Sequence, residues 1–240
     1  MSNQSKINTP AETIVALCTP QGSGSIALIR VSGDQSIVLT STMSKLSSGG
    51  LLHQQATHTI HHGHVIHPST GEIVDEVLFL LMHAPRTFTG ENTVEITCHN
   101  NPFIIDTIIT LLITNGARAA RPGEFTQQAL LNNKIDLPQA EAIQELIAAQ
   151  SEEGVKRSLA QLKGSLSEHF AILERSLINV LTLAEASFEF LDEEQRDVDL
   201  DAQFYAQFDA LKHYIKQLNE AYSQQKHLRD GFRIALIGGV

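Results

Sequence analysis

Hydrophobic and polar residues alternate in the first half of the chain, whereas hydrophobic residues recur every three or four positions in the second half. Alternation is typical of strands with one buried face, and the longer spacing is typical of amphipathic helices. The pattern as a whole indicates an α+β protein. The expected strands are 13–18, 26–31, 59–66, 73–82 and 94–99, and the expected helices of the first half are 36–46 and 102–113.

The two strands 73–82 and 94–99 differ in pattern. The first is hydrophobic almost throughout, which predicts a central position with both faces buried. In the second, the polar side chains fall on one face, which is either solvated or the wall of a cleft. A carboxylate such as Glu95 is suited to accept paired N–H donors from an aminopyrimidine-type ring. The inward residues are Val94, Ile96 and Cys98, and the outward residues are Glu95, Thr97 and His99.

Arg30 lies near the C-terminal end of the apolar strand 26–31. A guanidinium in that position needs a partner, which is either a protein carboxylate or a planar anionic or heterocyclic ligand. The preceding loop, 20–25, contains glycines, but its spacing differs from that of a phosphate-binding fingerprint and no helix follows it directly. We therefore interpret the loop as a connector, and the sequence leaves the partner of Arg30 open.

The segment 121–137 separates the alternating half from the helical half. Pro122 and Gly123 predict a turn, because proline disfavours a helical conformation in the residue before it and glycine relaxes the backbone. Thr126 is expected to cap a short helix that ends at 132–133.

A second helix is expected to begin at Asp136, which is a good N-cap, with Gln139 as its partner in a capping box. Lys134 then lies between two helix ends, where a lone lysine is usually solvated. Further on, the apolar stripes at 159–180 and 204–222 predict two long amphipathic helices. Such stripes form a core or a dimer seam more often than a cofactor site.

Composition narrows the function classes. The formal net charge of −10 argues against a protein that grips nucleic acid with its whole surface, so a nucleic-acid role needs a local patch or a partner. The sequence has no apolar run long enough to span a bilayer and begins with a polar segment, which makes a cytoplasmic location the default. Cys18 and Cys98 lie in apolar runs and are expected to be free core residues.

Three further segments contain residue types that occur in metal-binding or phosphate-binding sites. The histidines at 58–67 include His62 and His64 at the spacing of a metal site, but no carboxylate or thiol lies among them, and exposed histidines are the simpler interpretation. The acidic residues at 189–201 do not have the spacing of a calcium loop and indicate a solvated connector. At the end, the apolar run 232–237 leads into Gly238, as a strand leads into a phosphate loop, without the lysine and serine that grip phosphate.

These stretches together resemble the MnmE (TrmE) family of tRNA uridine-modifying GTPases over essentially the whole chain. The resemblance rests on several ungapped blocks in the same order: 13–16, 20–26, 29–33, 88–91, Val94-Glu95, 121–125, 131–137 and 139–142. The family usually has His-Gly-Gly where this chain has His99-Asn100-Asn101. Asparagine tolerates left-handed backbone but adds bulk, so the local turn and the access of a ligand are expected to differ from those of the family.

The resemblance implies a domain order and a ligand. Residues 1–122 would form a mixed-sheet folate-binding and dimerisation domain, similar to the tetrahydrofolate domain of the aminomethyltransferase. Residues 123–230 would form the first part of a helical bundle domain, and 231–240 the first strand of a Ras-like GTPase domain. By motif match, Arg30, Glu95 and Lys134 would contact 5,10-methylene- or 5-formyl-tetrahydrofolate, and Gly238 would open the phosphate loop.

The resemblance also implies partners and an activity. The family forms a homodimer through its N-terminal domain, acts with the flavin-dependent protein MnmG, and modifies C5 of the wobble uridine of certain tRNAs with a one-carbon unit. GTP, Mg²⁺ and K⁺ would act in the full-length protein only, and this stretch, with no catalytic residue and no metal site of its own, is expected to lack GTPase activity. The alternatives are a stand-alone folate-dependent aminomethyltransferase and a coiled-coil scaffold.

Overall fold

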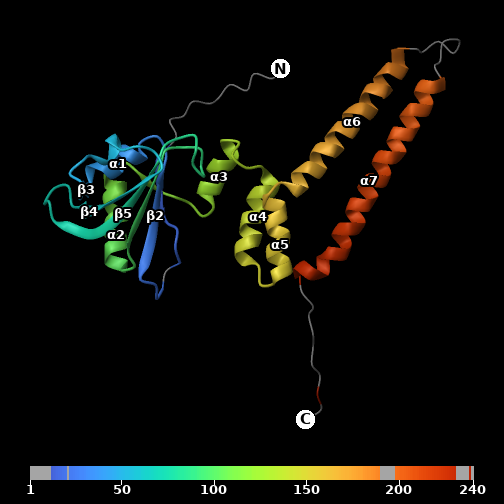
Figure 1. Ribbon diagram of the computed structural model, residues 1–240. Helices are drawn as coiled ribbons and strands as arrows, with labels where there is room; N and C mark the ends of the chain where they lie inside the picture. Colours follow the sequence, from blue (N-terminus) through green and yellow to red (C-terminus); the bar gives the residue numbers. More distant parts are fainter. Residues whose placement is uncertain (1–11, 21, 190–197, 231–237, 239–240) are drawn as a thin grey trace. The chain divides into compact units, whose positions relative to one another are not determined.

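The strands of the first half of the chain form one sheet in the order β3-β4-β5-β6-β2-β1-β7 (Figure 1). Neighbouring strands are antiparallel except β1 and β7, which are parallel, so the sheet is mixed and the predicted α+β class is confirmed. The strands are β1 (Ile14–Leu17), β2 (Ile26–Ser32), β3 (Ser44–Leu46), β4 (Thr59–Ile66), β5 (Ile73–Met82), β6 (Thr93–His99) and β7 (Arg118–Ala119).

The computed structural model describes residues 12–20, 22–189, 198–230 and 238. By its internal contacts the chain divides into two units, Met1–Ile135 and Asp136–Val240, which we call the sheet unit and the helical unit. The sheet unit also contains the 3₁₀ helix η1 (Leu52–Gln54) and the helices α1 (Ser36–Thr42), α2 (Pro102–Thr114) and α3 (Glu124–Leu131). The helical unit contains α4 (Leu137–Ala148), α5 (Glu152–Leu162), α6 (Ser165–Glu189) and α7 (Val198–Asp230).

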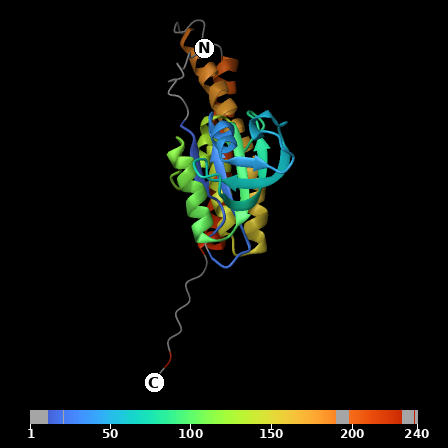
Figure 2. The ribbon, with the colours of Figure 1, turned by 90° about the vertical axis from the view of Figure 1, so that its left-hand side faces the viewer.

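The core of the sheet unit lies between one face of the sheet and helix α2, which runs alongside it (Figures 1 and 2). Ile29, Phe79 and Ile96 from three adjacent strands are fully buried there, as are Ile108 and Leu112 from α2. Burying a side chain of this size contributes about 1.5–3 kcal/mol relative to leaving it exposed. This packing fixes β2 and β6, whose opposite face carries the candidate site.

Strand β5 is central, as predicted, but it is buried on one face only. Phe79 and Leu81 are fully buried, whereas Leu78 between them is 41% exposed. The prediction of two buried faces is wrong because the core residues of α1 and α2 pack on the side of Phe79. Apolar residues on the outer face of the sheet therefore stay accessible, among them Ile26 and Ile60.

The predicted helix at 36–46 is shorter in the structure. Helix α1 ends at Thr42, and residues 44–46 form strand β3, which pairs with the edge of β4. Hydroxyl side chains at 40–42 lower the helix propensity here, and pairing with β4 satisfies the backbone that a longer helix would have satisfied.

The start of the helical unit confirms the predicted capping box. The carboxylate of Asp136 accepts a hydrogen bond from the backbone N–H of Gln139 at 2.9 Å, and the side-chain oxygen of Gln139 accepts one from the backbone N–H of Asp136 at 2.9 Å. The stripe at 159–180 does not lie on one helix, because Gly164, with a φ of +96°, separates α5 from α6. The stripe at 204–222 lies within α7.

The remaining sequence expectations fall partly outside the described residues. Of the acidic segment, Asp199 and Asp201 lie in the first turn of α7, where the helix dipole favours carboxylates, and 190–197 lie outside the described part. The expected strand 232–237 also lies outside it, and Gly238 is exposed without regular structure. The division after Ile135 places α3 with the sheet, whereas the predicted boundary precedes it, and the functional segments 1–122, 123–230 and 231–240 stay predictions. No described helix has the length and hydropathy needed to cross a bilayer.

Candidate binding site around Arg30 and Glu95

Arg30 and Glu95 lie directly opposite each other on the adjacent strands β2 and β6, on the outer face of the sheet. Arg30 donates to Glu95 Oε1 from Nε at 2.8 Å, and its second nitrogen, Nη2, lies 2.7 Å from the same oxygen. The sequence left the partner of Arg30 open, and within the protein it is this carboxylate. Among the described residues none donates a hydrogen bond to Glu95 Oε2, although the Glu95 side chain is only 14% exposed.

Two aromatic rings flank the Arg30 guanidinium. The carbon Cζ of Arg30 lies 5.4 Å from the ring centroid of Phe88 and 5.4 Å from that of Phe125. Both distances are within the range of cation–π attraction. Phe88 belongs to the loop 85–91 before β6, and Phe125 belongs to the first turn of α3. The guanidinium is therefore fixed by a carboxylate and by two rings.

The loop 85–91 is fastened to β2 and to the C-terminal end of α3. The hydroxyl of Ser32 is 2.7 Å from that of Thr89, and the amide of Asn132 donates to the carbonyl of Thr89 at 2.7 Å. Gly90 has a φ of +80°, and a Cβ atom there would lie 2.9 Å from Cβ of Asn132. Only glycine fits this close approach, which keeps Phe88 in place.

The side chain of Lys134 contacts the loop 85–91 and not the Arg30–Glu95 ion pair. Its Nζ donates to the carbonyl of Pro85 at 2.9 Å, and its side-chain carbons pass close to Gly90. The structure thus brings Arg30 and Glu95 into direct contact and joins Lys134 to the segment that carries Phe88.

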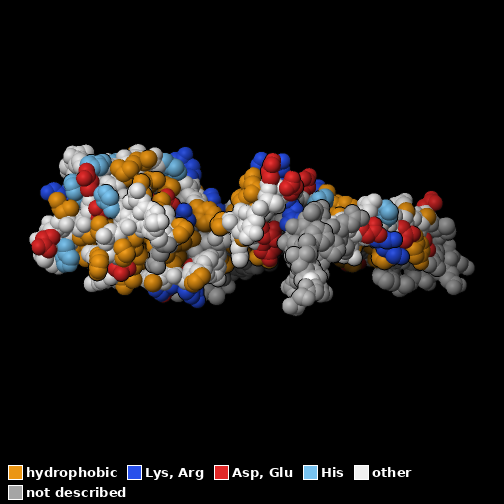
Figure 3. All heavy atoms as spheres, turned by 90° about the horizontal axis from the view of Figure 1, so that it is seen from below, with side chains coloured by type: hydrophobic (Ala, Val, Ile, Leu, Met, Phe, Trp, Pro, Cys, Tyr) orange, Lys and Arg blue, Asp and Glu red, His pale blue; other side chains and the backbone are white. Residues whose placement is uncertain are grey.

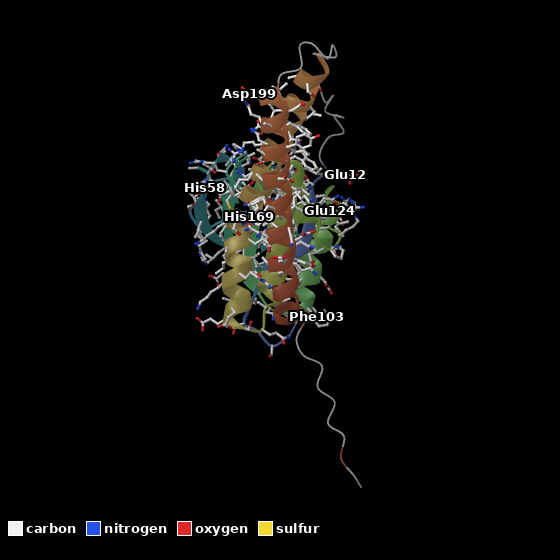
Figure 4. All side chains as sticks on the ribbon, turned by 90° about the vertical axis from the view of Figure 1, so that its right-hand side faces the viewer. Glu12, His58, Phe103, Glu124, His169 and Asp199 are labelled. Atoms are coloured by element: carbon white, nitrogen blue, oxygen red, sulfur yellow. The ribbon has the colours of Figure 1, made fainter. Side chains whose placement is uncertain are left out.

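The first turn of α3 is held by a second arginine–glutamate cluster, around Glu124. This carboxylate is 6% exposed and accepts hydrogen bonds from Arg118 (3.1 and 2.7 Å) and from the backbone and side chain of Arg121 (2.7 and 3.2 Å). These donors, Arg118 first, lower the pKa of Glu124 to about 2. Arg118 also pairs with Glu12, which lies on the same side of the sheet unit (Figure 4).

The cluster explains why the predicted cap is wrong. Thr126 was expected to cap this helix, but the helix begins at Glu124, behind Gly123 with a φ of +75° and no side-chain cap. The buried ion pairs of Glu124 fix the start of the helix instead. Sequence reasoning did not single out Phe88, Glu124, Phe125 or Asn132, although all four lie inside the blocks of the resemblance.

Two family models match this sequence. Residues 13–134 match the GTP-binding protein TrmE N-terminus, and residues 137–233 match the MnmE helical domain. The chain belongs to the MnmE (TrmE) family. It is 41% identical over 229 residues to the tRNA modification GTPase MnmE of Protochlamydia amoebophila, covering 95% of this chain and 49% of that protein. The corresponding enzyme of Lysinibacillus sphaericus is 38% identical over 95% of this chain and 49% of its own length. The chain spans about half the length of the curated relatives it matches.

The departure from the MnmE pattern at His99-Asn100-Asn101 does not depend on left-handed backbone, because neither asparagine has a positive φ. The side chain of Asn101 caps α2 by accepting from the N–H of Phe103 at 2.9 Å. The amide of Asn100 donates to the carbonyl of Gly22 at 2.8 Å, so its added bulk ties the end of β6 to the loop before β2.

His99 is oriented by a buried carboxylate. Asp75, which is 8% exposed, accepts from the backbone N–H of His99 at 2.8 Å through one oxygen and lies 2.7 Å from its Nδ1 through the other. This hydrogen bond raises the pKa of the exposed His99 imidazole. His99 therefore continues the polar face of β6 beyond Glu95 and Thr97, as the alternation predicted.

The two cysteines are free, and they differ in environment. Cys98 is 3% exposed, and burial raises the pKa of its thiol to about 11, with Asp75 adding to the effect. Cys18 is exposed, so its predicted place in the core is wrong. Partial desolvation raises the pKa of Cys18, while Arg30 lowers it and Glu95 raises it, so this thiol lies beside the candidate site.

The histidine-rich strand β4 places His62 and His64 on one face with their ring centroids 6.2 Å apart. His62 contacts the exposed carboxylate of Glu76 at 2.7 Å. In the described part of the chain, no three His, Cys, Asp or Glu side chains are grouped in a way that holds a metal ion.

Proposed function

We propose that the sheet unit binds a reduced folate through Arg30, Glu95 and Lys134. The observation that carries the proposal is the state of Glu95. Arg30 occupies only its Oε1, and the carboxylate lies on the outer face of the sheet with Oε2 unused by any described residue. A carboxylate with a free oxygen is the acceptor that the amino group and ring N–H of a pterin require.

The two cations have different roles in this proposal. Arg30 is planar and held by rings and carboxylate, so it offers directional donors to polar groups of the folate. Lys134 is a flexible point charge whose ammonium group now binds the carbonyl of Pro85, and it exchanges that contact for an oxygen of the ligand. In this proposal the ligand is a one-carbon donor, such as 5,10-methylene- or 5-formyl-tetrahydrofolate, and the three residues hold it in place.

We further infer that the sheet and helical units belong to a GTPase that modifies the wobble uridine of certain tRNAs at C5, together with the flavin-dependent partner MnmG. Support comes from the two family matches and from relatives that are named tRNA modification GTPases. GTP, Mg²⁺ and K⁺ are assigned to sequence that those relatives have beyond the matched half. On the face in Figure 3, Lys and Arg appear in small separate groups. Together with the formal net charge of −10, this supports tRNA binding through a local surface or through the partner.

A homodimer through the sheet unit is part of the same proposal. The outer face of the sheet exposes large apolar residues at the ends of its strands, with Ile26 at 61% and Ile60 at 64%. Accessible apolar side chains on this face are available for contact with a second copy of the sheet unit.

Calorimetric titration with 5-formyl-tetrahydrofolate tests the folate site. Glu95→Gln keeps the shape and removes the charge, and it is expected to weaken binding roughly tenfold to a hundredfold, the scale of charged hydrogen bonds. Glu76→Gln, an exposed carboxylate on the same face of the sheet, is the matched control and should bind as the wild type does. Equal binding by Glu95→Gln, or no saturable binding by the wild type, would overturn the assignment.

A further inference from the structure

The Arg30 guanidinium takes its orientation from two rings that arrive from different directions, and both are tied to helix α3. Phe125 is part of that helix, and Phe88 lies on the loop that the end of the helix holds. The ion pair with Glu95 therefore has a support that lies outside the two strands that carry it.

At the N-terminal end of α3, the support is electrostatic. Glu124 is buried and accepts four hydrogen bonds from Arg118 and Arg121, which fix the first turn of the helix against β7. The next residue is Phe125. A shift of this turn would carry the Phe125 ring away from the guanidinium, because side chains in the first turn follow the backbone that the carboxylate holds.

At the C-terminal end of α3, the support is a single amide. Asn132 donates to the carbonyl of Thr89, the residue after Phe88, and its Cβ packs against Gly90. Asn132 and Glu124 are eight residues apart at opposite ends of one short helix. One rigid element thus sets both rings.

We propose that α3 is a bracket that pre-orients Arg30 for the ligand, with Phe88 and Phe125 as the contact residues of the guanidinium and with Glu124 and Asn132 as positioning residues. The inference rests on the proposed folate site and adds to it a specificity mechanism. With Nε and Nη2 of Arg30 directed to Glu95 Oε1, Oε2 is left for a flat heterocycle with adjacent N–H donors. Such preorganisation strengthens binding because the side chains lose little freedom when the ligand arrives.

The aromatic requirement distinguishes this role from simple packing. Phe125→Leu keeps an apolar side chain and removes the ring, and Phe125→Tyr restores the ring. Phe103→Leu is the matched control, because Phe103 lies at the start of α2 (Figure 4), is 83% exposed and is not one of the two rings near the Arg30 guanidinium. Phe88→Leu and Phe88→Tyr repeat the test on the second ring.

The first readout needs no ligand. The Nε–H signal of Arg30, assigned by its loss in Arg30→Lys, lies under two ring currents in the wild type. It is expected to move in Phe125→Leu and Phe88→Leu and to return toward the wild-type position in the tyrosine variants. Phe103→Leu should leave it in place.

The second readout is calorimetric affinity for 5-formyl-tetrahydrofolate. Phe125→Leu is expected to bind it roughly threefold to thirtyfold more weakly, the scale of one cation–π contact, and Phe125→Tyr should recover most of the loss. Glu124→Gln should show both the shifted Arg30 signal and weaker binding. If Glu124→Gln does not fold, the Phe125 variants still decide the question.

The outcomes separate the two proposals. Tight binding by the wild type with equal binding by Phe125→Leu and Phe88→Leu would overturn the bracket and leave the folate site standing. No saturable binding by the wild type would overturn the folate site and the ligand role of the bracket together. A leucine variant whose affinity falls while its tyrosine counterpart fails to restore it would reduce the rings to packing and also overturn the inference.

Discussion

The sheet unit contains two arginine–glutamate clusters that use their carboxylates differently. Glu124 is almost fully buried, and both of its oxygens accept hydrogen bonds from two arginines. Glu95 is also largely buried, but among the described residues a single arginine contacts it, through one of its two oxygens. Both carboxylates are therefore largely buried and paired with arginine, and they differ in how many hydrogen bonds their two oxygens accept from described residues.

The difference suggests a criterion for separating a structural ion pair from a binding site. A saturated buried carboxylate stabilises the fold and has nothing left for a ligand. A largely buried carboxylate whose second oxygen is accessible, and accepts no hydrogen bond from a described residue, keeps that oxygen available to a ligand. By this criterion Glu124 has a structural role, whereas Glu95 keeps the acceptor oxygen that the proposed folate site requires.

The largest expected effect comes from Glu124. Its pKa is lowered to about 2 in the folded state, so its stabilisation is fully present above the unfolded pKa near 4.5 and is lost as the pH falls toward 2. Glu124→Gln should lower the free energy of unfolding of the sheet unit at pH 7 by about 2–3 kcal/mol, allowing for screening at the partly exposed Arg118.

Urea unfolding followed by circular dichroism at several pH values measures this. The gap between wild type and Glu124→Gln should be constant from pH 7 to about 5 and should close toward pH 2, where both side chains are neutral. Stability that differs by less than about 0.5 kcal/mol at pH 7, the scatter of ordinary surface substitutions, would contradict the structural role of Glu124.

Substitution of Glu95 should lower the free energy of unfolding much less than substitution of Glu124 in the same assay. Glu95→Gln is expected to cost about 1 kcal/mol or less, because Arg30 is its only charged partner among the described residues and the rings still hold that arginine. Saturating folate should then stabilise the wild type more than Glu95→Gln. A loss as large as that of Glu124→Gln would mean that saturation does not separate the two clusters.

Much of this fold could be predicted from the sequence because its signals are local. Alternation identified β2, β5 and β6, and the capping box at Asp136 and Gln139 fixed the start of α4. The errors arise where tertiary contacts decide. Residues 44–46 became a strand because β4 offered an edge, and Leu78 is exposed because the helices cover the other face.

The site was only partly predictable for the same reason. Spacing placed Glu95 on a polar face and showed that Arg30 needs a partner, but it did not show that the partner is Glu95, which is 65 positions away in the sequence. The rings of Phe88 and Phe125 converge through α3, a packing arrangement with no local pattern. The sequence pattern does not distinguish Glu124 from an ordinary acidic residue, because its two arginine partners are brought to it only by the fold.

The reactivity of the Cys18 thiol is a probe of the Arg30–Glu95 pair, and the expected effect on it is smaller. Glu95 raises the pKa of its thiol and Arg30 lowers it. Because the thiolate is the reactive form, Glu95→Gln should speed alkylation of Cys18 at pH 8 and Arg30→Gln should slow it, each by a few-fold. Bound folate should protect Cys18 from the reagent.

Cys98 is the internal reference for this measurement. With a pKa of about 11 and 3% exposure, it has on the order of one thiolate per thousand molecules at pH 8 and should stay unmodified in the folded protein. Peptide mapping by mass spectrometry after timed alkylation distinguishes the two thiols. Rates at Cys18 that ignore both substitutions would place it away from the ion pair.

Asp75 tests the comparison at its smallest expected effect, because its two oxygens are both used but by one exposed residue, His99. Asp75→Asn should lower the pKa of His99, since the hydrogen bond and charge of Asp75 raise it, with a lesser contribution from Glu76. The raised pKa stabilises the fold fully below about pH 6.5, the unfolded value, and this contribution disappears as the pH rises through the folded value. An NMR titration of the imidazole signals measures the shift, with the other histidines as controls, and a His99 pKa that stays the same in Asp75→Asn would show that a fully used carboxylate need not govern the side chain it holds.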